Sequence, residues 1–296
     1  MVEIPFKREL AFEYGVLETV SPLVRRIVAR NPGPFTAQGT GTYVVGHGKV
    51  AIIDPGPDIA AHVDALLAAL RGETVEKILV THTHLDHSPA AAAVKLATGA
   101  PTYGYGPHAA QFGPAVEEGG DRSFVPDHAI GDGDEISGPG WHLGAVHTPG
   151  HTSNHLCFAL AEEQVLFSGD HVMGWSTSVI APPDGNMGDY LRSLEKLLHR
   201  DDARYLPTHG PAITDPKPFV GAFIEHRRER EAAILARLAA GDREIPAMVQ
   251  AIYVGLDSRL HRAAARSVLA HLIELVAEGR VASEGPPTVD ARYRLK

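Results

Sequence analysis

A short segment near residue 85 carries four side chains of the types that bind metal ions. His82, His84, Asp86 and His87 lie within six consecutive residues, directly after an apolar run at 77–80 that is typical of a buried strand. Residues two apart in extended backbone point the same way, so His82 and His84 should project together from the end of the strand. As the chain turns, Asp86 and His87 can point at a second position nearby. Composition alone produces such a pattern with a probability of about 0.003, so the segment predicts a site for two adjacent cations.

Three more residues of ligand type lie further along the chain, each in a loop with Gly or Pro after an apolar run. They are His151 in HTPGHTSNH, Asp170 in VLFSGDH and His209 in YLPTHG. Loops at strand ends are where functional residues usually lie. The single cysteine, Cys157, lies in the apolar run HLCFAL and is predicted to be a buried core residue. A metal site in this chain must therefore use imidazole and carboxylate ligands.

Over residues 30–215 the sequence resembles the metallo-β-lactamase superfamily, because five motifs occur in that family's order. They are IDPG, THTHLDH, TPGHT, SGD and PTHG. The resemblance implies an α/β fold, the four-layer αββα sandwich. Within the family, an aspartate at position 170 resembles the glyoxalase II and ribonuclease Z side rather than the enzymes that have a thiolate ligand. The resemblance also implies site roles: His82, His84 and His151 for the first metal, Asp86, His87 and His209 for the second, Asp170 bridging both, and Asp54 orienting a ligand from outside the metal shell.

Residues 31–46, NPGPFTAQGTGTYVVG, together with the C-terminal tail, resemble the lactamase-beta-two-like branch of this superfamily. That branch has a C-terminal winged helix and includes proteins with single-strand endoribonuclease activity. The sequence departs from its relatives at Gly41, where they carry Asn, at His171 after Asp170, and in a long loop at 181–188. These departures lie near the expected cleft and leave the substrate open. His155 and His171 flank motif residues and are predicted to make simple polar contacts.

Strand and helix patterns alternate up to about residue 215, which favours a mixed α/β domain. We expect a hairpin across Gly46-His47-Gly48, helices over 59–70, 90–98 and 190–199, a second hairpin with a Glu-Glu turn near 162, and a loop over 106–140. After Pro211, Pro216 and Pro218, helices are expected over 219–240, 245–253 and 258–278, followed by a two-stranded hairpin. This order is typical of a winged helix. The predicted domains are a metallo-β-lactamase domain, 1–218, and a winged-helix-like domain, 219–296.

The ligand types indicate the chemistry. Imidazole and carboxylate without thiolate suit Zn²⁺, two ions per chain, with Fe or Mn as alternatives. A hydroxide that bridges two such ions can attack a carbonyl or phosphoryl centre, because metal binding lowers the pKa of water to about 7. Asp86 is the predicted catalytic residue, because it could orient that water or pass a proton to the leaving group. The predicted function is hydrolysis of an ester, thioester or lactone of a small molecule.

Three other functions stay open at this point. They are a metal-dependent endoribonuclease acting on single-stranded RNA, a mononuclear iron dioxygenase of the same fold, and a non-catalytic metal-stabilised or DNA-binding protein. The net charge of −9 does not favour holding a nucleic-acid backbone. The alternating charges at 226–231, including Arg227, predict a solvated helical face.

The sequence also gives expectations for location and partners. It has no apolar run of about 18 residues or more, so no membrane partner is expected. The first 15 residues have no apolar core of a signal peptide, which predicts a cytoplasmic protein. A homodimer is compatible with the winged-helix-like tail.

Overall fold

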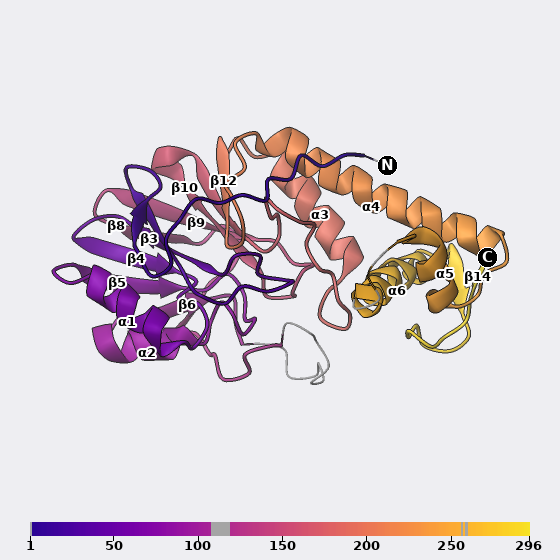
Figure 1. Ribbon diagram of the computed structural model, residues 1–296, viewed down its shortest axis with the longest axis horizontal. Helices are drawn as coiled ribbons and strands as arrows, with labels where there is room; N and C mark the ends of the chain where they lie inside the picture. The colour runs from indigo at the N-terminus through magenta and orange to yellow at the C-terminus, as the bar shows by residue number, and fades with distance from the viewer. Residues whose placement is uncertain (1, 108–118, 256, 258–259) are drawn as a thin grey trace.

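Two β-sheets pack face to face between two layers of helices, as Figure 1 shows for this computed structural model. The structure describes residues 2–107, 119–255, 257 and 260–296. Helices α1 (Ala60–Ala69) and α2 (Ala90–Thr98) cover the seven-stranded sheet, and helices α3 (Met187–Leu198) and α4 (Pro216–Ala239) cover the five-stranded sheet. The predicted four-layer αββα sandwich is confirmed. Helix α4 continues beyond the sandwich to a smaller C-terminal unit (Figure 1).

The seven-stranded sheet begins with antiparallel strands and continues with parallel ones. The predicted hairpin joins β3 to β4, and its two turn glycines, Gly46 and Gly48, both have positive φ angles. The strands are β1 (Glu18–Thr19), β2 (Val24–Val28), β3 (Gly41–Val45), β4 (Lys49–Ile53), β5 (Thr74–Leu79), β6 (Thr102–Gly104) and β7 (His128–Ala129).

The five-stranded sheet runs in the order β12-β11-β10-β9-β8. The predicted hairpin across Glu162 and Glu163 joins β10 to β11 through a single 3₁₀ turn at Ala161–Glu163. The strands are β8 (Glu135–Gly138), β9 (Trp141–His147), β10 (Leu156–Leu160), β11 (Val165–Gly169) and β12 (Arg204–Pro207).

Three apolar layers hold the sandwich together. Tyr43, Trp141 and Phe167 fill the space between the sheets. Leu66 of α1 (Ala60–Ala69) belongs to the layer over the first sheet, which also holds α2 (Ala90–Thr98). Phe223 of α4 (Pro216–Ala239) belongs to the layer over the second sheet, which also holds α3 (Met187–Leu198). Burying each large apolar side chain contributes about 1.5–3 kcal/mol, so these layers stabilise the packing of the two sheets.

Cys157 is fully buried in the layer between the second sheet and α3. Burial raises the pKa of its thiol to about 12. The thiol therefore stays protonated near neutral pH, and the predicted core role of Cys157 is confirmed.

The structure corrects several element boundaries. The stretch 106–140 was expected to be loop, yet strands β7 and β8 lie within it, and 108–118 lie outside the described residues. Helix α3 begins at Met187 rather than at residue 190, because the Asn186 side chain accepts a hydrogen bond from the Asp189 N–H and caps the first turn. Helix α4 begins at Pro216, because proline is well accommodated in a first helical turn.

The C-terminal unit has the predicted order of helices and hairpin. Its core includes Ile234 and Leu238 from the second half of α4. Its other elements are α5 (Ile245–Ile252), α6 (His261–Ala277), β13 (Val281–Ser283) and β14 (Tyr293–Leu295), and residues 258–259 of the expected helix lie outside the described residues. Helix α4 thus contributes to the cores of both the sandwich and the C-terminal unit, and the domain boundary at 218 stays a prediction. In the part of the chain that the structure describes, no helix combines the length and apolar character needed to cross a membrane.

Candidate metal centre

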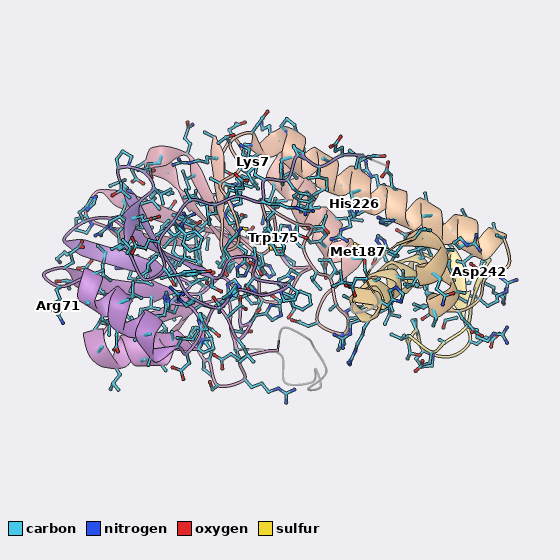
Figure 2. All side chains as sticks on the ribbon, viewed as in Figure 1. Lys7, Arg71, Trp175, Met187, His226 and Asp242 are labelled. Carbon is cyan, nitrogen blue, oxygen red and sulfur yellow. The ribbon has the colours of Figure 1, made fainter. Side chains whose placement is uncertain are left out.

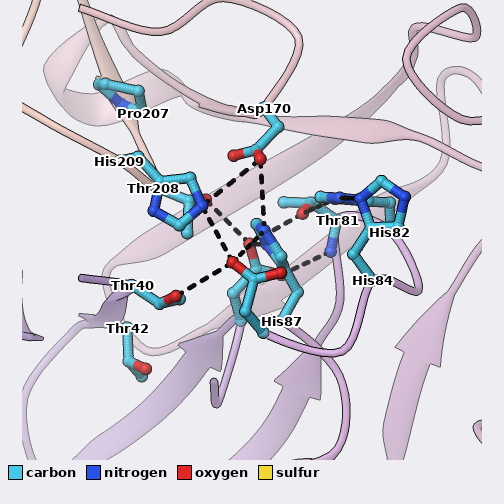
Figure 3. Close-up of polar contacts among 12 residues, drawn as sticks. Thr40, Thr42, Thr81, His82, His84, His87, Asp170, Pro207, Thr208 and His209 are labelled. Carbon is cyan, nitrogen blue, oxygen red and sulfur yellow. Dashed lines mark hydrogen bonds and ion pairs between the residues drawn. The ribbon is translucent and has the colours of Figure 1, made fainter. Parts of the chain in front are cut away.

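The predicted site residues meet at one end of the sandwich. Asp54 follows β4, residues 81–87 follow β5, His151 lies beyond β9, Asp170 follows β11 and His209 follows β12. These strands run toward the same edge of the two sheets, so the loops after them converge (Figure 3). The structure therefore brings together residues that are more than a hundred positions apart in the chain.

Asp54 is a buried carboxylate that hydrogen-bonds to residues of two of the other loops. Its carboxylate accepts hydrogen bonds from the Thr81 N–H at 2.7 Å, the Thr81 hydroxyl at 2.8 Å and the Thr208 hydroxyl at 3.0 Å. The Nδ1 of His87 lies 2.9 Å from Asp54 Oδ2. Because Nδ1 is engaged in this way, the Nε2 atom of His87 is turned toward the other site residues (Figure 3). The predicted orienting contact of Asp54 is with His87.

Three imidazoles form the first ligand group. His84 Nδ1 lies 2.8 Å from His82 Nε2 and 3.1 Å from His151 Nε2. The other nitrogen of His151, Nδ1, lies 2.6 Å from the carbonyl oxygen of Val179 and is the donor there. Burial lowers the pKa of all three rings, and for His82 and His84 neighbouring imidazoles lower it further. The neutral form of imidazole, which binds metals, is therefore favoured.

Asp86, His87 and His209 form the second ligand group. Asp86 Oδ2 lies 3.0 Å from His209 Nε2 and 3.4 Å from His87 Nε2. The hydroxyl of Thr40 donates to the same carboxylate at 3.1 Å. His209 Nδ1 lies 3.1 Å from the Gly39 carbonyl oxygen, which leaves Nε2 facing the group. In Figure 3, Thr40 and His209 both lie on the left of the close-up, and their dashed contacts run to the right.

Asp170 lies between the two groups. Its Oδ2 atom is 3.4 Å from His209 Nε2, 3.5 Å from His87 Nε2 and 3.9 Å from His151 Nε2. Asp170 Oδ1 and His87 Nε2 are both buried, and neither forms a hydrogen bond with any residue that the structure describes. Buried polar atoms are rarely left without a partner, and each such atom needs an explanation. Metal ligation supplies one, so the residues present fit a pair of metal ions.

The charges of the second group are closely balanced. Burial acts to raise the pKa of Asp170, but His209 and His87 outweigh it and hold that pKa well below its usual value. Burial acts to lower the pKa of His209, but the Asp170 and Asp86 carboxylates raise it to about 10. Without a metal ion, protons supply the positive charge that the carboxylates require, and a divalent cation could replace those protons.

Several residues that position the ligands were not singled out from the sequence. Thr81 and Thr208 hold Asp54, and Thr40 holds Asp86 while its own hydroxyl accepts from the Asn31 side chain at 2.9 Å. A threonine directly before a ligand histidine occurs in both THTHLDH and PTHG, and this repetition was an available signal. Main-chain acceptors such as Gly39 leave no such signal.

His155 and His171 differ from one another in their contacts. His155 Nε2 accepts from the Asp170 N–H at 3.2 Å, and its Nδ1 lies 2.9 Å from the Thr148 hydroxyl, so its predicted polar contact is confirmed. The same prediction is wrong for His171, whose ring is fully buried and whose two nitrogens form no hydrogen bond within the described part of the chain. Its ring instead packs against Tyr190, with centroids 4.8 Å apart.

The departure from the family pattern at Gly41 has a packing reason. Gly41 opens β3, and its N–H donates to the Thr208 carbonyl oxygen at 2.9 Å. A Cβ at this position would lie 3.1 Å from that oxygen and 3.2 Å from the Arg26 side chain. The strand therefore approaches the PTHG loop closely, which keeps Thr208 against Asp54.

A cavity of about 220 Å³ opens beside the second ligand group. Phe35 and Leu85 form part of its apolar wall, and the Leu85 side chain is 51% exposed although it lies inside the metal-binding motif. The remaining lining residues include no Lys or Arg among those that the structure describes; they are Gly33, Pro34, Thr36, Asp86, Asp170 and His209.

The fold and this ligand set define a class of protein, and comparison with known families agrees with it. Residues 36–209 match the metallo-beta-lactamase superfamily, and residues 245–287 match the beta-lactamase associated winged helix domain. The chain belongs to the metallo-β-lactamase superfamily and carries that winged helix. The predicted fold class is thereby confirmed, and the findings support a metal-binding hydrolase of this fold.

Particular relatives are similar over most of the chain. The Caenorhabditis elegans beta-lactamase-like protein 2 homolog is 33% identical over 275 residues, covering 90% of this chain and 88% of that protein. An atrochrysone carboxyl ACP thioesterase from Aspergillus novofumigatus is 34% identical over 234 residues, covering 76% of this chain and 66% of its own.

Solved structures give the same fold. A beta-lactamase domain protein from Burkholderia ambifaria superposes with a TM-score of 0.81 at 20% identity, covering 97% of this chain and 96% of that one. The protein TTHA1623, solved in a di-iron-bound form, is 27% identical with a TM-score of 0.51, covering 68% of this chain and 96% of that one. The His and Asp cluster of the present chain is consistent with a binuclear metal site.

Proposed function

We propose that this protein hydrolyses an ester, thioester or lactone bond of a small molecule whose acyl group is apolar. The observation that carries the proposal is the cavity beside Asp86, Asp170 and His209, which combines a cluster of metal-ligand side chains with an apolar wall. Pockets of this kind, apolar with a few converging polar groups, are typical of small-molecule sites. The similarity to fungal thioesterases supports the same assignment.

The proposed metal is zinc, with two ions per chain, because imidazole and carboxylate ligands without thiolate suit it. When bound, such a pair of ions supplies Lewis-acid polarisation of the substrate carbonyl and lowers the pKa of water to about 7. The residues proposed to hold them are His82, His84 and His151 for one ion and Asp86, His87 and His209 for the other, with Asp170 between the two.

Asp86 is the proposed catalytic residue of the chain itself. Its side chain is 20% exposed and lines the cavity, whereas His87 and His209 are almost fully buried. Thr40 donates to its Oδ2 atom and so limits how the carboxylate can rotate. A carboxylate held in this way can accept a proton from water and pass it to the leaving oxygen or sulfur.

The endoribonuclease stays as a second candidate because of the winged helix matched at residues 245–287. Proteins that bind a nucleic-acid backbone usually present a clear basic patch. The described residues that line the cavity contain no Lys or Arg, and the chain has a net charge of −9. These two features favour the small-molecule substrate.

Metal content and substrate screening together test the proposed function. We expect elemental analysis to find about two zinc ions per chain. We also expect the protein to hydrolyse medium-chain acyl thioesters or esters, and this activity should stop with a chelator and return when zinc is added. Cleavage of single-stranded RNA with no ester or thioester activity would replace this proposal with the nuclease. One iron per chain, with oxygen consumption in place of hydrolysis, would replace it with the dioxygenase.

Leu85→Ser is expected to weaken the use of long acyl groups selectively. Removing the apolar contact of one leucine costs about 1 kcal/mol, which corresponds to roughly a fivefold rise in KM. We expect this rise for an octanoyl thioester and little change for an acetyl thioester, as measured by steady-state kinetics. The matched control is Leu96→Ser on α2, where the side chain is 89% exposed and away from the cavity lining. Equal changes for the two acyl lengths would contradict the apolar subsite.

A further inference from the structure

Arg227 is a buried cation in the middle of α4. Its side chain is only 4% exposed, so the predicted solvated position is wrong for this residue. Its guanidinium donates a hydrogen bond to the carbonyl oxygen of Ser178 and lies 5.3 Å from the centre of the Tyr190 ring. No carboxylate in the part of the chain that the structure describes forms an ion pair with it. Burying a charge is costly unless its partners are well placed, so the partners of Arg227 are informative.

The segment that Arg227 holds is the one that orients a predicted metal ligand. Ser178 and Val179 are consecutive, and their carbonyl oxygens face two different partners. The Ser178 carbonyl accepts from Arg227, and the Val179 carbonyl accepts from Nδ1 of His151 at 2.6 Å. A hydrogen bond from the far nitrogen of a ligand histidine fixes its tautomer and ring orientation, so that Nε2 is the nitrogen presented to a metal.

Two further contacts tie this segment to the loop that follows Asp170. The Ser178 hydroxyl and the Tyr190 hydroxyl both donate to the main-chain carbonyl oxygen of His171, at 2.8 and 3.0 Å. Tyr190 in turn lies under the Arg227 guanidinium. Arg227 therefore supports two loops: the one that orients His151, through the Ser178 carbonyl, and the one that follows Asp170, through Tyr190.

The helices around Arg227 connect this support to the C-terminal unit. Helix α3 packs against both α4 and α6. His226, the neighbour of Arg227, lies where α4 passes over α3 (Figure 2). His271 of α6 is buried, and both burial and the nearby Arg227 charge lower its pKa, to about 3. His271 thus brings α6 of the C-terminal unit near the residue that supports the metal-site loops.

We propose that Arg227 is a positioning residue of the metal site, acting from α4 through the consecutive Ser178 and Val179 carbonyls on His151. This inference rests on the proposed metal-dependent function, and it assigns the C-terminal helices a part in building the site. Arg227 does not touch the ligands itself. Its removal frees the segment, so the His151 ring loses the fixed acceptor that holds Nε2 toward His84.

The test is the zinc affinity of Arg227→Met, measured by competition with a chromophoric chelator. Outer partners of metal ligands typically contribute about 10–100-fold in affinity, and we expect a loss near tenfold or above. Arg227→Lys keeps the charge and one donor, and we expect it to recover part of this loss. The matched control is Arg228→Met, one residue along α4, where the side chain is 61% exposed beside Glu195; it should bind zinc as the original protein does.

A double-mutant cycle separates this role from general stabilisation of the fold. If Arg227 acts through His151, its replacement should change zinc affinity much less when His151 is already alanine, because coupled residues are not additive. An unchanged affinity in Arg227→Met, an equal loss in Arg228→Met, or full additivity with His151→Ala would each overturn the proposal. If Arg227→Met does not fold, as judged by its melting transition, the same double-mutant cycle is measured with Arg227→Lys. Absence of zinc binding by the unaltered protein would instead refute the proposed function.

Discussion

Asp170→Asn is expected to remove tight binding of the metal pair and to lower kcat/KM by about 10³-fold or more. This factor corresponds to the loss of several kcal/mol of transition-state stabilisation that the metals supply. The reason is the position of the carboxylate. Asp170 Oδ2 reaches His87, His209 and His151, so it belongs to both ligand groups at once. An amide has nearly the same shape but carries no charge, and one of its two atoms is a donor that cannot bind a cation.

Metal content by elemental analysis and steady-state kinetics measure this effect. Asp202→Asn is the matched control, because the Asp202 side chain is also 8% exposed but pairs with Arg200 rather than with the metal-site histidines. The control should lose some stability and keep both zinc and activity. Retention of two zinc ions with near-normal turnover in Asp170→Asn would exclude Asp170 as the bridging residue.

The ligand set could be predicted from sequence because its members are bound to regular local patterns. His82 and His84 are two apart after a strand, and His151, Asp170 and His209 each lie in a loop after an apolar run, so local patterns marked them as candidates. Their division between two metal ions was implied only by the resemblance to the superfamily. Alternation of strands and helices predicted a mixed α/β domain, and the four-layer sandwich was implied by the resemblance to the superfamily.

The supporting contacts could not be predicted in the same way because they depend on tertiary approach. Val179 and Gly39 act through carbonyl oxygens, which every residue has, so no side-chain type marks them. Arg227 was expected in solvent because neighbouring charges alternate along α4, yet it is buried, with Tyr190 of α3 beside it and His271 of α6 near its charge. Periodicity within one helix cannot show which other helices will cover it. The helix starts at Met187 and Pro216 depended on capping and on proline in the first turn, both of which are local but weak signals.

The second large effect is expected for Asp54→Asn, which leaves the backbone in place and changes the hydrogen bonds made at Oδ2, above all the one with His87. Asp54 has a φ angle of 49°, a left-handed conformation that Asn adopts readily. The new Oδ1 can still accept from the Thr81 N–H. The new amide group, however, places a donor where Asp54 Oδ2 faces His87 Nδ1 at 2.9 Å. His87 must then carry its proton on Nε2, which is the atom that would bind the metal.

We therefore expect Asp54→Asn to fold and to bind the second zinc about 10–100-fold more weakly. Its kcat should fall by about 10²-fold or more, because a histidine held in the wrong tautomer is ineffective as a ligand or a base. Zinc titration should resolve one site weakened much more than the other, because Asp54 contacts His87 directly and reaches the first ligand group only through the Thr81 hydroxyl, 3.1 Å from His82 Nδ1. The control is Asp58→Asn, in the same loop but exposed. Equal weakening of both sites would point to general disruption of the fold, and two tight sites would show that His87 does not depend on Asp54 for its tautomer.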